Sequence, residues 1–236
     1  MTLEEQSSST QGKSQQPSRI GDDVAYVLPM GSFLLFTFLG GHWPGLFVAS
    51  YIVKTIVAGV LLILLRRHFT KIKWSSAWLG VIVGIVGIVQ WVGMEKLLLH
   101  FWPNYPRLSA EAFDPFKTIS SPALLWSFIA IRLLGPVLVV PFMEEYFWRD
   151  FLWRTIMAPN DFKMMKIGDW DWQAVIVVAL AFASVHIQWM TAIVWGLMIA
   201  WLLIRTRSLG ACIIAHAVTN LLLGIYVLGW HDWAFW

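Results

Sequence analysis

The chain has 236 residues, of which 58% are hydrophobic and 13% are charged, and its formal net charge at pH 7 is +3. Soluble domains carry about 25% charged residues, so this composition excludes a soluble domain and indicates a protein that crosses a membrane several times. The single cysteine, Cys212, excludes an intramolecular disulfide framework and a four-cysteine zinc site.

The first 22 residues are rich in serine, glutamine and threonine and contain no apolar core. A segment of this composition cannot bury enough apolar surface to fold, so we expect a disordered cytoplasmic tail over residues 1–22. It lacks the cationic start and directly following apolar core of a secretory signal. The remainder, residues 23–236, is then expected to form a single transmembrane domain.

Apolar segments of bilayer-spanning length recur through the remainder of the chain. An uncharged stretch of this kind is typical of a transmembrane helix. The sequence therefore predicts an all-α, polytopic membrane bundle of about seven transmembrane helices, and a number from six to eight is consistent with the pattern. The expected spans cover residues 24–39, 45–65, 78–99, 122–141, 172–187, 189–204 and 209–228.

The apolar run over residues 122–157 is too long for one untilted crossing at ~20 residues per span. Pro136 and Pro141 each remove a backbone donor within it and should bend the helix. We expect one span that ends near Pro141 and a helix that continues at or just inside the membrane interface.

Lysine and arginine are distributed unevenly between the two sides of the membrane that these spans define. Cytoplasmic loops carry an excess of both, so the cation-rich side is expected to be cytoplasmic and to hold the amino terminus. Arg107 and Lys117 fall on the opposite side. Twelve of the 17 cations fall on the amino-terminal side: Lys13, Arg19, Arg66, Arg67, Lys71, Lys73, Arg149, Arg154, Lys163, Lys166, Arg205 and Arg207.

Adjacent carboxylates stand in the apolar segment FMEEYFWRDFLWR, residues 142–154. A carboxylate is costly in low dielectric, so Glu144 and Glu145 each need a partner or a chemical role. Glu145 and Arg149 are four residues apart and can form an ion pair along one helix face. Glu144 points about 100° away from Glu145 on a helix of ~3.6 residues per turn, so it can face a cavity instead.

Three further polar side chains interrupt the late apolar spans: His186 in the fifth, and His216 and Asn220 on one face of the seventh. The free-energy cost of placing these groups and Glu144 in the membrane is lowest if they share one water-filled cavity. A glutamate can act as general base toward water, and histidine and amide groups can orient that water or stabilise an oxyanion. The same groups could instead hold zinc through Glu144, His186 and His216, although no HExxH motif is present.

The polar residues of the second half form three ordered motifs: Glu144-Glu145-x-x-x-Arg149, Phe182-x-x-x-His186 and His216-x-x-x-Asn220. This set resembles the signature of the CAAX-protease and bacteriocin-processing family, intramembrane proteases similar to the type II CAAX prenyl endopeptidase. The first half is similar to the bacterial CAAX-protease-related branch that occurs beside exosortase systems. The resemblance implies a location in the bacterial inner membrane.

The resemblance also implies roles for the motif residues. Glu144 and His186 would activate water, and His216 and Asn220 would stabilise the oxyanion. A metal-free mechanism is preferred, with zinc as the alternative. Supporting roles would fall to Glu145, Arg149 and Phe182.

The function expected from these observations is an intramembrane endopeptidase that cuts near the cytoplasmic face. Its partners would be the lipid bilayer and a membrane protein or lipid-anchored peptide as substrate, and no nucleic acid. One alternative is a catalytically inactive relative that serves as an immunity or partner-binding scaffold. A transporter is another, in which ionisable residues within the spans would line a pathway: Lys54, Glu95, Lys96 and Arg132.

Overall fold

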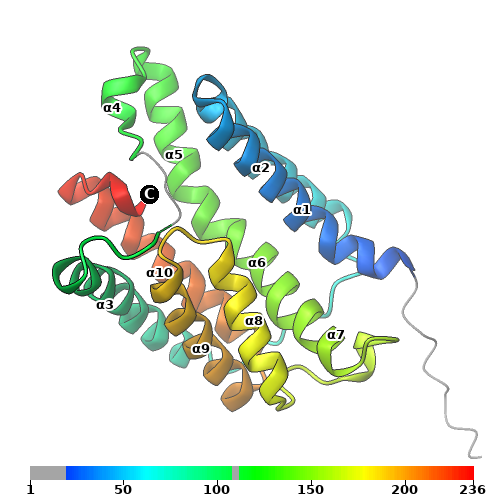
Figure 1. Ribbon diagram of the computed structural model, residues 1–236. Coiled ribbons are helices and arrows are strands. Elements are labelled where there is room, and N and C mark those ends of the chain that lie inside the picture. The colour runs from blue at the N-terminus through cyan, green and yellow to red at the C-terminus, as the bar shows by residue number, and fades with distance from the viewer. Residues whose placement is uncertain (1–19, 108–111) are drawn as a thin grey trace, which may run out of the picture.

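The computed structural model describes residues 20–107 and 112–236 as an α-helical bundle without strands in these two ranges (Figure 1). This confirms the all-α class predicted from composition. The predicted tail over residues 1–22 lies outside the described residues except for 20–22, which already belong to the first helix.

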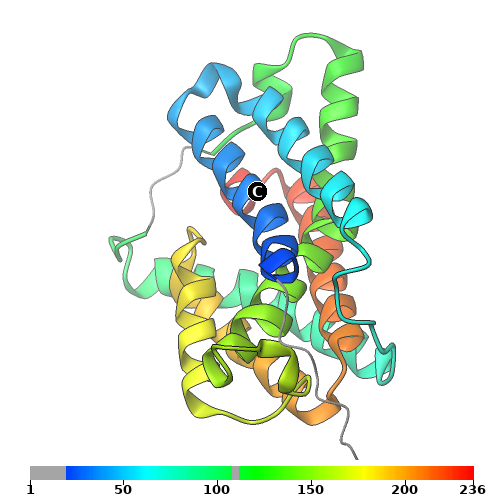
Figure 2. The ribbon, with the colours of Figure 1, turned by 90° about the vertical axis from the view of Figure 1, so that its right-hand side faces the viewer.

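Six helical stretches of the described residues are long and apolar enough to cross a membrane. They agree in place with six of the seven expected spans, and α1 and α2 run side by side (Figure 2). The six stretches contain α1 (Ile20–His42), α2 (Phe47–Leu64), α3 (Ala77–Phe101), the long run Pro122–Met157, α9 (Trp189–Thr206) and α10 (Leu209–Trp230).

The remaining expected span, the fifth in chain order, is shorter than predicted. The helix α8 covers Trp172–Ser184, which is 13 residues or about 20 Å at 1.5 Å per residue, whereas the hydrocarbon core is about 30 Å thick. Residues 185–188 turn the chain directly into α9, which packs against α8. His186 therefore lies in a turn after α8, and its placement within a spanning helix was wrong, because apolar residues continue through the turn and hide it from hydropathy.

The run Pro122–Met157 is a single helical stretch of 36 residues with one bend. The chain does not turn back within it, so it does not form two crossings. It consists of α5 (Pro122–Leu138), α6 (Val140–Glu145), the π-helical segment η2 (Tyr146–Leu152) and α7 (Trp153–Met157), which follow one another in Figure 1. The break falls at Val139, whose φ is −108°. Pro141 has no N–H to donate to the carbonyl of Val137, which explains a break at this point.

The central contact of the bundle is formed by α3 and α10, where glycine allows the two backbones to approach closely. A Cβ atom on Gly84 would lie 2.7 Å from the carbonyl oxygen of Ala215 and 2.7 Å from the Cβ of Val218. Thr219 donates a hydrogen bond of 2.9 Å across the same contact to the carbonyl of Gly84. Small residues are therefore required on this face of α3.

Three of the cation-bearing segments meet at one end of the bundle, as the charge distribution predicted. Lys163 pairs with Asp22 at 2.8 Å and donates to the carbonyl of His68 at 3.2 Å. Ser208 donates to the carbonyl of Lys73 at 2.8 Å. We call this the cation-rich end, defined by residues 66–73, 158–171 and 205–208. Arg149, which the sequence placed among these cations, is instead buried inside the bundle.

The α3–α10 contact gives a stability prediction. We expect Gly84→Ala to lower the free energy of unfolding by about 1–3 kcal/mol, the usual cost of overpacking, because the added methyl group meets a backbone carbonyl that cannot move alone. Thermal unfolding of the detergent-solubilised protein measures the change. Gly93→Ala is the matched control on the same helix, since a Cβ there meets nothing within 4 Å. Equal melting temperatures for the two variants would contradict the proposed packing.

Candidate active site

Glu145 is fully buried and holds two partners at once. Its Oε1 atom accepts a hydrogen bond of 2.8 Å from Nδ1 of His216, and its Oε2 atom lies 3.4 Å from Nε of Arg149. The predicted pair of Glu145 with Arg149 is thus confirmed, and both side chains are at most 1% exposed. Through His216 the same carboxylate also ties the first motif to α10.

Glu144 lies beside Glu145 at the end of α6 and is also buried, with 6% of its surface exposed. Its Oε2 atom has no hydrogen-bond partner among the residues that the structure describes. The Oε2 atom of Glu145 also lacks a hydrogen bond, but it lies within ion-pair distance of Arg149, and Oε1 accepts from His216. The two adjacent carboxylates therefore differ in that Glu145 has these two partners and Glu144 has neither an ion pair nor a hydrogen bond among the described residues. The helix geometry expected from the sequence separates the two in this way.

His186 is half-buried in the turn between α8 and α9. Its Nδ1 atom lies 2.7 Å from the carbonyl oxygen of Phe182, so Nδ1 must carry the proton of this hydrogen bond. In the neutral imidazole Nε2 is then left as an acceptor. The ring centroid lies 4.2 Å from that of Phe182 and 5.8 Å from that of Trp91, which fixes its orientation.

His216 is buried in α10 with 5% of its surface exposed, and its ring packs edge-on against Trp195 at 6.1 Å. Because a carboxylate only accepts hydrogen bonds, Nδ1 of His216 donates to Glu145. The Nε2 atom carries no described bond and is the one available for chemistry. It can donate only when the imidazole is doubly protonated.

Asn220 lies one turn after His216 and is half-buried. Its Nδ2 atom donates a hydrogen bond of 2.7 Å to the carbonyl oxygen of Pro136, on the α5 side of the helix break. One amide hydrogen therefore holds α10 against α5, and the second remains for another acceptor. This structural bond was not visible in the sequence, because the two residues are 84 positions apart.

The three motifs are in contact with one another: α6, which carries Glu144, contacts α10, which carries His216. The ring of Phe182 lies 4.2 Å from that of His186 and 4.9 Å from the guanidinium of Arg149. Elements from α6, from the turn after α8 and from α10 contribute to the candidate site. The catalytic roles that the sequence suggested for these residues remain predictions.

Two buried donors in η2 were not singled out from the sequence as free groups. The guanidinium of Arg149 lies 4.9 Å from the ring centroid of Phe182, and its Nη1 and Nη2 atoms have no hydrogen-bond partner among the described residues. The same is true of Nε1 of Trp148. The signal available in the sequence was the pair Trp148-Arg149, which follows the two glutamates within one helical turn.

A zinc site does not fit the arrangement of these residues. Among residues 20–107 and 112–236, no three histidine, cysteine, aspartate or glutamate side chains lie close enough together to hold a metal ion. Glu144, His186 and His216 are therefore not positioned as three zinc ligands. The preference for a metal-free mechanism remains a prediction.

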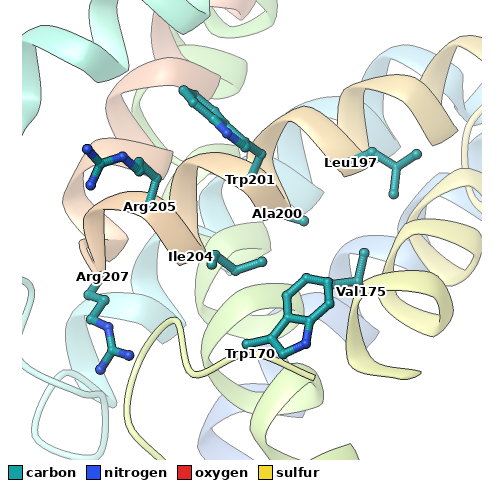
Figure 3. A pocket seen from close by; sticks show the side chains of 8 residues that line it. All are labelled: Trp170, Val175, Leu197, Ala200, Trp201, Ile204, Arg205 and Arg207. Atoms are coloured by element: carbon teal, nitrogen blue, oxygen red, sulfur yellow. The ribbon is translucent and has the colours of Figure 1, made fainter. Parts of the chain in front are cut away.

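A separate groove of about 500 Å³ lies between α8 and α9 and does not involve the motif residues (Figure 3). Apolar side chains and Trp170 and Trp201 line it, and Arg205 and Arg207 stand at its cation-rich end. It is therefore not part of the candidate site.

Residues 125–222 match the family model described as "Rce1-like: Type II CAAX prenyl endopeptidase Rce1-like". The matched range contains all three motifs, from Glu144 to Asn220. No curated protein and no solved structure matches the chain. The first half of the chain lies outside the match, so its similarity to the exosortase-associated branch stays a prediction.

The two glutamates should differ in their effect on stability. We expect Glu145→Ala to lower the free energy of unfolding by about 3–5 kcal/mol, because it leaves the buried Arg149 without a carboxylate. Glu144→Gln should shift it by less than about 1 kcal/mol, since the replaced oxygen binds nothing. Chemical unfolding in mild detergent measures both. The assignment fails if Glu144→Gln proves the more destabilising change.

Proposed function

We propose, on the premise that residues 125–222 make this chain an Rce1-like member of the CAAX-protease family, that it is an intramembrane endopeptidase with Glu144 as its general base. The observation that carries the proposal is the difference between the two adjacent carboxylates. Glu145 pairs with Arg149 and accepts a hydrogen bond from His216, whereas Glu144 is buried and has neither an ion pair nor a hydrogen bond among the described residues. A general base needs such a free lone pair within the cavity.

Water activation would use two acceptors from two motifs. Glu144 takes the proton as water attacks the scissile carbonyl, and the same proton is later passed to the leaving amine. Nε2 of His186 is the acceptor left by the bond of Nδ1 to Phe182, and it accepts the second O–H of the water. Two acceptors fix the direction in which the oxygen lone pair points, which favours attack by orientation.

The tetrahedral intermediate would place its oxyanion beside α10. His216 donates from Nε2 as an imidazolium whose charge is balanced by Glu145, and the free amide hydrogen of Asn220 is the second donor. Both donors are held by bonds to other elements before substrate arrives. Preorganised donors of this kind need no rearrangement at the moment when charge develops.

The substrate class follows from the membrane setting. In lipid, an intact helix keeps its carbonyls in its own hydrogen bonds, so a cleavable segment must be extended at the cut. A membrane protein or lipid-anchored peptide with such a segment near the cytoplasmic headgroups meets this requirement. The cation-rich end is then cytoplasmic, and water reaches the site from that side.

The activity prediction uses the isosteric variant. Glu144→Gln should remain folded and show at least about 10²-fold lower turnover, because an amide oxygen cannot take the proton from water. The measurement is mass-spectrometric detection of new peptide termini after incubation of the purified protein with a panel of membrane peptides. Asp232→Asn is the control, since Asp232 pairs with the exposed Lys96 near the C-terminal end of α3 and belongs to none of the three motifs. Normal turnover by Glu144→Gln would remove Glu144 from the mechanism, and a wild type that cuts nothing would favour the scaffold alternative.

The topology prediction places the cation-rich end in the cytoplasm. In a Cys212→Ser background, Lys117→Cys should react with a membrane-impermeant maleimide on intact cells, and Lys71→Cys only after permeabilisation. Both positions are exposed, and Cys212 is fully buried, so accessibility does not bias the comparison. The reverse labelling pattern would invert the orientation and move cleavage to the opposite face.

A further inference from the structure

Among the described residues, three cations outside the three motifs are buried, and only Arg154 has a carboxylate partner, Asp150. Lys54 of α2 is 8% exposed, and Arg132 of α5 is 4% exposed. Neither forms an ion pair with a carboxylate among residues 20–107 and 112–236. An ionisable residue within a membrane span is costly and normally faces a partner or a functional cavity.

The surroundings of Arg132 are aromatic and leave its hydrogen bonds unmade. Its Nε and Nη1 atoms are buried and have no hydrogen-bond partner within the described residues. Four rings lie around the guanidinium at 4.9–5.7 Å: Phe47, Tyr51, Phe128 and Trp236. Rings attract the cation through their faces but do not accept its in-plane N–H groups as a carboxylate does.

Lys54 is placed similarly and shares a ring with Arg132. Its Nζ atom donates one hydrogen bond of 3.1 Å to Thr37 and lies 4.4 Å from the centroids of Phe33 and Tyr51. An ammonium group has three donors, so two are left without a described partner. Because the ring of Tyr51 lies near both cations, the two charges occupy one region around α2, with Lys54 at the contact with α1 and Arg132 on α5.

This region adjoins the candidate active site. Arg132 lies one helical turn before Pro136, whose carbonyl holds Asn220. The helix α2, which carries Lys54, contacts α6, which carries Glu144, although the two side chains form no ion pair. Gly135 lies so close to Thr55, the neighbour of Lys54, that a Cβ would come within 2.7 Å of its Cγ2. The helices that carry the cations are therefore in tight contact beside the site.

We propose that Lys54 and Arg132 form a subsite that binds a carboxylate of the peptide held in the active site. The inference rests on the proposed function, because the anionic groups of an unmodified peptide are carboxylates. Such a group would complete the hydrogen bonds of both cations and balance their charge in a region of low dielectric. The carboxylate belongs either to an aspartate or glutamate side chain or to a free carboxyl terminus.

The test is a binding comparison that does not need cleavage. Four probes are used, each with an N-dodecanoyl chain on a dipeptide: Ala-Gly with a free terminal carboxylate, Ala-Gly amide, Ala-Asp amide and Ala-Asn amide. Affinity is measured from the rise in melting temperature with probe concentration, in wild type and in Glu144→Gln. We expect at least one carboxylate probe to bind about 10-fold or more tightly than its neutral partner in both proteins. The probe that shows the difference identifies the side-chain or the terminal source.

Variants then assign the preference to the two cations. Arg132→Met and Lys54→Met should each abolish the difference between acid and amide, and Arg132→Lys should retain part of it. Lys96→Met is the matched control, because Lys96 is an exposed cation paired with Asp232, and it should leave the difference unchanged. Equal affinity of acid and amide probes for the wild type would overturn the proposal even if a methionine variant failed to fold. An acid preference in a protein that cuts no peptide would keep the subsite and reject the protease function.

Discussion

The structure depends on how a buried carboxylate is neutralised within an apolar interior. A charge in that environment is retained only with partners, because desolvation costs more than one weak contact returns. Glu145 has two such partners, Arg149 from the same helical rod and His216 from α10. This assignment has three consequences: it joins two motifs, it directs Nε2 of His216 away from Glu145, and it leaves Glu144 as the carboxylate without an ion pair.

Helix irregularity is concentrated around the same residues. Pro141 breaks the backbone bonding near Val139, and the segment directly after Glu145 is π-helical. Each irregularity leaves backbone groups that need other partners, and Asn220 supplies one by donating to Pro136. The hydrogen bond that satisfies a carbonyl at the helix break thus also positions Asn220 in the site. Changes in the packing of the run Pro122–Met157 should therefore also change the geometry of the site.

The sequence was sufficient for features that depend on local spacing. Apolar runs located six spans correctly, and the four-residue offset predicted the pair of Glu145 with Arg149. Features that depend on long-range packing were missed. Hydropathy could not end α8 before His186, because Val185 and Ile187 continue the apolar pattern on either side of it. The contact of His216 with Glu145 joins residues 71 positions apart, and no periodicity contains that information.

The free carboxylate of Glu144 poses a final question, because its charge must be tolerated without a direct partner. A salt bridge like that of Glu145 would occupy the lone pairs that water needs. Coulomb attraction falls only as the inverse of distance, whereas a hydrogen bond requires contact, so cations a short way off can stabilise a carboxylate and leave its oxygens open. Lys54 is buried in α2, which contacts α6, the helix that carries Glu144, and the two side chains form no ion pair. Its position is thus consistent with charge balance at a distance, which leaves the oxygens of Glu144 open to water.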